Sequence, residues 1–303
     1  MTEPIPAGLG VVHEHGRSVR VTWHGRPLAR YVYVPWEAQL ESPRPYVHPL
    51  WTLDGRPVSL YRPHDHVWHK GISLALSNVG TENFWGGPTY LRAEGGYAQL
   101  PNNGTQAHEA FDEVGVADGV VTIAQRLRWV TEAGASVLTE RRRITFDADP
   151  DSGAWRLGFT STVDNVSGVP IPFGSPTTEG RPDAGYSGLF WRGPRSFSGG
   201  GVLTPDRAGA DDLNGTVAPW MAFTGRHDGD GTHSTLLFVN RPGPVEWFVR
   251  SEVFAVVCPA PFFSAVHTLP AGGTLEFAHD VWVADGALDA AACEQLAKRE
   301  PPA

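Results

Sequence analysis

Residues 119–131 read GVVTIAQRLRWVT, residues 136–147 read SVLTERRRITFD, and residues 154–165 read AWRLGFTSTVDN. Apolar and polar side chains alternate in each stretch, which is the period of a half-buried β-strand and not of a helix. Two turn segments, Ala133–Gly134 and 149–153, separate the stretches. The three stretches therefore predict an antiparallel meander with one face in water.

The same kind of pattern continues on both sides of the meander. Short alternating or apolar runs occupy much of residues 8–61 and 217–285, with turn residues between them. Glycine (35) and proline (26) are abundant, which favours many short strands joined by tight turns. Residues 86–108 and 168–201 are dense in turn-forming residues and are predicted as long loops. Only residues 287–299 are predicted as a helix, capped by an aspartate.

These features predict one all-β domain over residues 1–303, a large antiparallel β-sandwich with a short C-terminal helix. The net charge is −9 and no basic block is present, which argues against nucleic acid as a partner. No run of 18 apolar residues occurs, so no membrane span is expected. The N-terminal stretch MTEPIPAGLG lacks the basic and apolar regions of a signal peptide. With only Cys258 and Cys293 present, we expect a cytoplasmic protein with reduced thiols, and a homo-oligomer is compatible with the sequence.

The stretch YRPHDHVWHKG at residues 61–71 holds three histidines, His64, His66 and His69. In an extended chain His64 and His66 share a face, and a turn at residues 67–68 would be needed to bring His69 beside them. Three convergent histidines would suit Zn, Mn or Fe. Without a metal, His66 or His69 would act as a general acid or base near neutral pH, while His64 would bind substrate. A satisfied structural cluster is the third alternative.

A second loop, TTEGRPDAGYSGLFWR at residues 177–192, combines carboxylate, guanidinium and aromatic groups that suit sugar recognition. Glu179 is a candidate catalytic base that would face a histidine acid. Asp183, Tyr186 and Arg192 are candidates for substrate binding, and Arg192 is also a candidate oxyanion donor. The alternative is a solvated loop with local ion pairs.

Further candidates lie on separate segments of the chain. His267 is a candidate catalytic residue, although a lone histidine is as readily a hydrogen-bonded core or rim residue. The remaining candidates for substrate binding are Arg44, His48, Asn83 and Trp85. Trp85 could offer a ring on which the apolar face of a sugar stacks. The sequence requires no cofactor, and a divalent metal remains the alternative for the histidine loop.

Three separated regions, residues 45–85, 177–192 and 259–277, carry a resemblance to a known family. PYVHPLWTLDGRPV at 45–58 is followed by HDHVWHKG at 64–71 and ENFW at 82–85, and the later loops at 177–192 and 259–277 match in order. Together they resemble the PmoA-like family, whose name refers to methane oxygenase. The resemblance implies a protein that often accompanies sugar oxidoreductases. Trp68 stands where that family usually has a histidine, which weakens any mechanism that needs the missing ring.

The ending LPAGGTLEFAHDVWVADG at residues 269–286 is similar to the end of galactose-mutarotase-like β-supersandwich proteins. Taken with the residues above, this resemblance implies a pocket for a small carbohydrate. We expect a carbohydrate-active enzyme, a lyase, epimerase or glycoside-cleaving enzyme, that acts on a sugar or keto-sugar by His/Glu acid–base chemistry. The alternatives are a non-catalytic carbohydrate-binding protein and a metal-dependent oxygenase.

Overall fold

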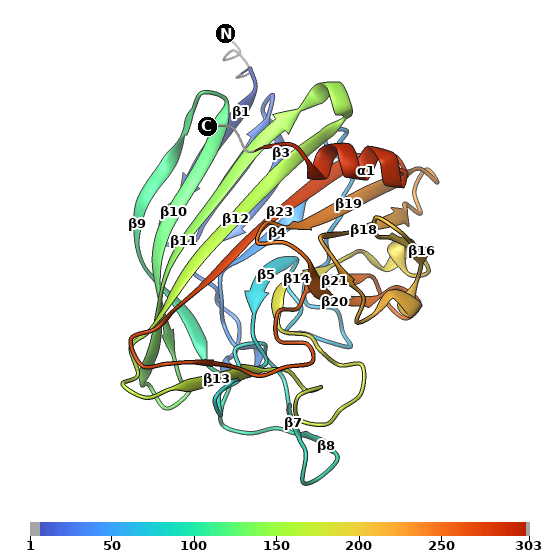
Figure 1. Ribbon diagram of the computed structural model, residues 1–303. Helices are drawn as coiled ribbons and strands as arrows, with labels where there is room; N and C mark the ends of the chain where they lie inside the picture. Colours follow the sequence, from blue (N-terminus) through green and yellow to red (C-terminus); the bar gives the residue numbers. More distant parts are fainter. Residues whose placement is uncertain (1–6, 301–303) are drawn as a thin grey trace.

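The computed structural model describes residues 7–300. The protein consists mainly of two nine-stranded antiparallel sheets (Figure 1). The first six residues of the N-terminal stretch lie outside the described residues. The first sheet has the order β1-β2-β3-β4-β5-β14-β21-β20-β17. Its strands are β1 (Leu9–Glu14), β2 (Ser18–Trp23), β3 (Arg26–Val32), β4 (Tyr46–Leu50), β5 (Ile72–Ala75), β14 (Gly188–Arg192), β21 (Val256–Pro259), β20 (Val245–Arg250) and β17 (Val217–Ala218).

The second sheet has the order β16-β15-β18-β19-β23-β12-β11-β10-β9 and contains the predicted meander. Its strands are β16 (Ala208–Gly209), β15 (Gly201–Leu203), β18 (Trp220–Arg226), β19 (His233–Asn240), β23 (Thr274–Asp285), β12 (Ala154–Asn165), β11 (Ser136–Asp149), β10 (Val120–Val130) and β9 (Thr105–Ala117). In β10, Ile123, Leu127 and Trp129 are buried, whereas Arg126 and Arg128 are exposed, so the expected wet face is confirmed.

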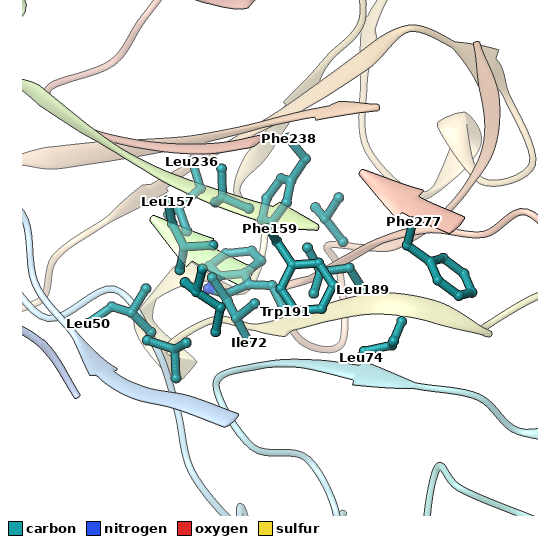
Figure 2. Packing of buried hydrophobic residues seen from close by; sticks show 14 of the residues in the cluster. Leu50, Ile72, Leu74, Leu157, Phe159, Leu189, Trp191, Leu236, Phe238 and Phe277 are labelled. Carbon is teal, nitrogen blue, oxygen red and sulfur yellow. The ribbon is translucent and has the colours of Figure 1, made fainter. Parts of the chain in front are cut away.

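The core lies between the two sheets (Figure 2). Ile72 and Leu74 of β5 and Trp191 of β14 meet side chains of the second sheet such as Leu157 and Phe238. The facing residues alternate along each strand, as sheet-on-sheet packing requires. The predicted antiparallel β-sandwich is therefore confirmed, and its two large sheets form a supersandwich.

One α-helix, α1 (Ala290–Ala297), is present in residues 7–300, within the predicted 287–299. The Asp289 side chain accepts a hydrogen bond from the backbone N–H of Ala292 and caps the helix. The helix packs Cys293 and Leu296 against Trp282 on the outer side of the second sheet (Figure 1). Over this part of the chain no helix is both long and apolar enough to cross a membrane.

The two predicted long loops are partly wrong, because both contain strands. Residues 86–108 include β7 (Thr89–Leu91), β8 (Gly96–Ala98) and the start of β9. Residues 168–201 include β13 (Ile171–Gly174) and β14, and β13 pairs with β6 (Asn78–Val79) and β22 (His267–Leu269). The strand β14, GLFWR, lies in the middle of the sheet and is buried throughout. It therefore lacks the alternation that marks a half-buried strand.

A smaller apolar cluster covers the outer face of the first sheet. Odd-numbered residues of β14 point into the main core, whereas Phe190 points outward and packs with Trp85 and Cys258. Strand β20 behaves in the same way, because Trp247 is in the main core and Phe248 is in the outer cluster. This outer cluster forms the floor on which the loops of the candidate site rest.

Candidate functional site

A pocket of about 330 Å³ lies above the outer cluster. Its walls are formed by the loops that follow β4, β6, β13 and β20, together with residues on the strands β8 and β20. Its lining residues are His66, Trp68, His69, Trp85, Gly86, Pro88, Tyr97, Arg181, Ala184, Tyr186, Phe248, Arg250 and Phe254. The lining is mainly aromatic, with two histidines and two arginines and no carboxylate. Concave, largely apolar sites with a few convergent polar groups are typical of small-molecule binding.

Two turns fold the histidine loop so that His66 and His69 lie face to face. The backbone N–H of His66 donates to Pro63 O, and that of His69 donates to His66 O. The two imidazole rings stack with centroids 4.6 Å apart. The segment is therefore not extended, and the turn between His66 and His69 creates the pair that an extended chain would have kept apart.

The side chain of Trp68 fits against two glycines at the pocket wall. A Cβ atom on Gly87 would lie 2.7–2.8 Å from the Trp68 ring, and one on Gly86 would lie 2.7 Å from the Trp68 Cβ. Both glycines also have positive φ, 102° at Gly86 and 71° at Gly87. This close approach explains why the chain has two consecutive glycines after Trp85.

Arg192 sets the hydrogen-bonding state of His69. Its Nη1 lies 3.2 Å from His69 Nδ1, and because arginine can only donate, Nδ1 accepts and the proton of neutral His69 is on Nε2. Burial, followed by the charges of His66 and Arg192, holds the pKa of His69 well below its ordinary value. At neutral pH His69 is therefore an uncharged ring that can donate from Nε2.

Asp65 acts on the other histidine. Its Oδ2 lies 3.4 Å from His66 Nδ1, close enough for charge attraction although the two groups are not aligned as a hydrogen bond. Burial lowers the pKa of His66, and the Asp65 carboxylate partly opposes that shift. Burial alone would raise the pKa of Asp65, but Arg192 and neighbouring hydrogen bonds keep it below the ordinary value. Asp65 is thus ionised, and His66 is mainly neutral at pH 7.

The opposite side of the pocket is formed by tyrosine and arginine. The hydroxyls of Tyr97 and Tyr186 are 2.7 Å apart, and Arg181 donates to Tyr97 Oη. The Arg181 guanidinium also lies over the Tyr97 ring, 4.8 Å from its centroid. Tyr186 packs against Trp85 with ring centroids 4.6 Å apart. Aromatic contacts therefore connect this wall to the pocket floor.

Strand β20 contributes Phe248 and Arg250 to the pocket. Because side chains alternate along a strand, these two residues share the face opposite to Trp247 and Val249. The Arg250 guanidinium lies 4.8 Å from the centroid of the Phe248 ring. Its Nη2 donates to the carbonyl oxygen of Asp183, which anchors the arginine at the rim.

The three histidines proposed as metal ligands do not converge. His64 turns away from the pair and accepts a hydrogen bond of 2.8 Å from Arg195 Nη2. Across residues 7–300, no group of three or more His, Cys, Asp or Glu side chains could hold a metal ion. The described donor set therefore does not fit the metal alternative, and His64 is outside the pocket lining.

The structure brings neither Glu179 nor His267 into the pocket lining. A compact turn follows β13, with the N–H of Glu179 bonded to Ser175 O and the N–H of Arg181 bonded to Pro176 O. It is Arg181 that reaches the lining. His267 is exposed on β22, where its ring lies beside Phe262. The predicted pairing of Glu179 with a histidine is therefore not formed.

Several other candidates do not line the pocket, and their side chains form hydrogen bonds within the surrounding structure. Arg44 is buried and donates to the carbonyl oxygens of Trp68 and Trp85, at 2.8 Å each. Asn83 Oδ1 accepts from the backbone N–H groups of Trp85 and Gly86. His48 also lies outside the lining: its Nδ1 is 2.8 Å from Ser59 Oγ, and burial lowers its pKa to about 4.

Of the twelve candidates, His66, His69, Trp85 and Tyr186 line the pocket, while Arg192 contacts His69 from behind it. Asp183 contributes its backbone carbonyl to Arg250. The lining residues that were not predicted include Tyr97, Phe248, Arg250 and Phe254, whereas Arg181 belongs to the loop predicted for sugar recognition. For Phe248 and Arg250 the signal was the alternation in EWFVRS, which separates a core face from a second face.

Comparison with solved structures gives remote similarities. A candidate aldose 1-epimerase from Klebsiella pneumoniae has 12% identity and a TM-score of 0.41, with 96% of this chain and 85% of that chain covered. An α-galactosidase from Lactobacillus brevis has 8% identity and a TM-score of 0.43, with 94% and 41% covered. A heparan sulfate lyase mutant from Pedobacter heparinus has 9% identity and a TM-score of 0.41, with 93% and 36% covered.

The chain spans about a third to two-fifths of the length of the galactosidases and the lyase that it matches. At these identities and TM-scores the similarity carries no argument about reaction or substrate. No curated protein sequence matches the chain. A family model described as "Family of unknown function (DUF6807)" matches residues 18–298, and its description mentions no PmoA protein or methane oxygenase. The chain belongs to this family of unknown function, DUF6807.

Proposed function

We propose that this protein is a carbohydrate-active enzyme of the lyase or epimerase kind. In this proposal His66 removes a proton from a sugar carbon that lies next to a carbonyl group. The observation that supports it is the stacked pair of His66 and His69, whose rings have opposite partners at the floor of an aromatic pocket. An anion lies beside one ring and a cation donates to the other.

The two partners favour complementary states of the two rings. The Asp65 carboxylate favours a proton on Nδ1 of neutral His66, which leaves the lone pair on Nε2. Arg192 donates to Nδ1 of His69, which leaves a proton on Nε2. One ring is therefore suited to accept a proton and the other to donate a hydrogen bond to the oxygen on which negative charge develops.

The proposed step is balanced within these two residues and the substrate. The C–H bond next to the carbonyl breaks, its proton moves to His66 Nε2, and the electron pair moves to the carbonyl oxygen. His69 stabilises this oxygen by hydrogen bonding. Addition of a proton from water to the opposite face gives an epimer, with the first proton left on His66. Loss of a substituent from the next carbon, which leaves with the electrons of its bond, gives an unsaturated sugar.

The aromatic lining supports a sugar as the ligand. The C–H groups of a sugar ring form an apolar face that can stack on a flat aromatic ring, and its hydroxyls require hydrogen-bonding groups at the edge. Trp85 and Phe248 lie in the pocket floor, and the hydroxyls of Tyr97 and Tyr186 lie at its side. No carboxylate is among the lining residues, so the paired carboxylates used by most glycoside hydrolases are not offered here.

An exchange experiment tests this proposal. Keto-sugars, uronates and their glycosides are incubated with the protein in D2O, and NMR follows replacement of each carbon-bound proton by deuterium. We expect exchange or elimination with at least one sugar, and a loss of about 100-fold or more in His66→Gln. His233→Gln, at an exposed histidine on β19, is the matched control. Binding of sugars without exchange or product would instead favour the non-catalytic carbohydrate-binding alternative.

The metal-dependent oxygenase implied by the PmoA-like resemblance has less support. A metal site of that kind needs three protein ligands and an open position. His64 is held by Arg195, while the rings of His66 and His69 stack flat on each other. No step through a metal is therefore derived for this pocket.

A further inference from the structure

The charged groups in the pocket lining are Arg181 and Arg250, and both are cations. Most arginines in residues 7–300 form ion pairs with a carboxylate, with N···O distances below 4 Å. Neither Arg181 nor Arg250 belongs to any ion pair found in residues 7–300. Two unpaired guanidinium groups on the rim of one apolar pocket are a feature that a neutral sugar does not need.

Both arginines are held in place by neutral groups. Arg250 Nη1 donates to Val249 O at 2.8 Å, and Nη2 donates to the Asp183 carbonyl. Arg181 donates to Tyr97 Oη and lies over the ring of the same tyrosine. Each guanidinium has five N–H donors, so donors remain on both groups after these contacts. The side chains are thus oriented but their charges are not neutralised.

Nearby carboxylates do not cancel this charge. Burial lowers the pKa of Arg250, the carboxylates of Asp211 and Asp183 oppose the shift, and the positive charge of Arg181 adds to it. Both guanidinium groups line the same pocket. The Asp211 carboxylate accepts hydrogen bonds from the backbone N–H groups of Ser251 and Glu252, and it is not within ion-pair distance of Arg250.

We infer that the pocket takes a sugar that carries an oxyanion, a hexuronate in the first place, and that Arg181 and Arg250 bind its carboxylate. The planar guanidinium matches the two oxygens of a carboxylate, and the charges are complementary. The sugar ring would then lie over the aromatic floor near Trp85 and Phe248. This inference rests on the proposed function, because it names the class of sugar on which His66 would act.

A bound carboxylate also supports the proposed chemistry. The C–H bond next to the carboxylate of a uronate is weakly acidic, and neutralising the carboxylate makes its proton easier to remove. The proton would move to His66 Nε2, and the electron pair would be delocalised into the carboxylate. The pair then either takes a proton back or expels the substituent on the adjacent carbon, which leaves with the electrons of its C–O bond.

Calorimetric titration tests the inference. Glucuronate, galacturonate and mannuronate are each compared with glucose, galactose and mannose at low and high salt. We expect at least one uronate to bind about tenfold or more tightly than its neutral hexose, and the difference to shrink at high salt. Arg250→Gln and Arg181→Gln are expected to reduce the affinity for the uronate to that for the hexose. Arg26→Gln, which removes an exposed arginine outside the pocket lining, is the control.

The outcomes separate this inference from the proposed function. Equal binding of the uronate and the hexose, with no effect of salt, overturns the inference and leaves a sugar-binding pocket. Binding of benzoate but of no sugar, lost in Arg250→Gln, supports the anion subsite and overturns the carbohydrate proposal. Preference for glucose 6-phosphate or glucose 6-sulfate over glucuronate would support a site for an oxyanion-bearing sugar but overturn the assignment of a uronate as that sugar. The salt dependence of the wild-type protein keeps the test valid if a variant fails to fold.

Discussion

At the scale of single residues, Asp65 is the group that connects the two halves of the candidate machinery. Its Oδ2 lies 3.4 Å from His66 Nδ1 and 3.3 Å from Arg192 Nη2, and Arg192 in turn donates to His69. One carboxylate therefore influences the charge of His66 directly and the orientation of His69 through an arginine. Titration of His66 should report on this arrangement.

We expect the ring of His66 to titrate below the ordinary histidine pKa of 6.5, because burial disfavours its charged form. The base form is then present above that pKa, and exchange activity falls as the pH drops through it. In Asp65→Asn the carboxylate no longer opposes the burial effect, so both the titration and the acid limb of the activity should move to lower pH.

NMR titration of the histidine ring C–H signals measures this shift without any substrate. His66→Gln identifies the relevant signal, and His233→Gln should leave it unchanged. A His66 pKa that stays constant or rises in Asp65→Asn would contradict the assigned role of the carboxylate.

At the scale of elements, the histidine loop and the loop after β6 depend on each other through Trp68. Substitution Gly87→Ala places a methyl group 2.7–2.8 Å from the Trp68 ring and should push the indole away from its wall. Gly134→Ala, in the β10–β11 turn, is a matched control, because Gly134 also has positive φ but open space around its Cβ. Both variants should lose about 1–2 kcal/mol of stability from the backbone. Only Gly87→Ala should also lose ligand affinity, as measured by calorimetry.

Arg44 connects the same two loops through hydrogen bonds to their backbone carbonyl groups. Besides the carbonyls of Trp68 and Trp85 it donates to those of Glu41 and Ser42, and only the bond to Trp68 is partly exposed. Arg44→Met would leave these acceptors without a donor, which should lower the free energy of unfolding by about 3 kcal/mol or more.

Chemical denaturation monitored by tryptophan fluorescence measures that change. Arg26→Met, on an exposed part of β3, should change stability by less than about 0.5 kcal/mol. An Arg44→Met protein as stable as the wild type would show that the loops do not depend on this arginine.

These elements also show how far the sequence alone could lead. The alternation in β10, β11 and β12 predicts the meander because one face of these strands is wet. The fully buried β14 has no such alternation, so it was predicted as loop. His66 and His69 were found because they are close in sequence. Arg250 could not be assigned to their pocket, because β20 reaches it only through pairing with β21, which itself pairs with β14.

At the scale of the whole molecule, the main core contains a buried histidine that must stay uncharged. His279 lies on β23, the strand of the second sheet that pairs with both β12 and β19. It shares its face with Phe277 and Val281, and neither ring nitrogen has a hydrogen-bond partner in residues 7–300. Burial lowers its pKa to about 3. The charge state of this ring therefore couples the core of the sandwich to pH.

The sign of this coupling follows from the two pKa values. Between pH 6.5 and about 3 the unfolded chain binds a proton on His279 that the folded protein does not bind, so stability rises with pH in this window. The contribution is fully present above pH 6.5 and is lost as the pH falls toward 3. His279→Leu removes this proton and relieves two unsatisfied nitrogens, so we expect a gain of about 1–2 kcal/mol at pH 7.

Urea denaturation at a series of pH values from 7 to 4 measures both effects. The free energy of unfolding of His279→Leu should exceed that of the wild type by a margin that grows as the pH falls. Uptake of one proton corresponds to roughly 1.4 kcal/mol per pH unit between pH 6.5 and about 3. His233→Leu on the neighbouring β19, where the side chain is exposed, should show no such widening. Parallel pH profiles for the wild type and His279→Leu would mean that the ring is protonated to the same extent in the folded and unfolded states, contrary to its burial between the two sheets.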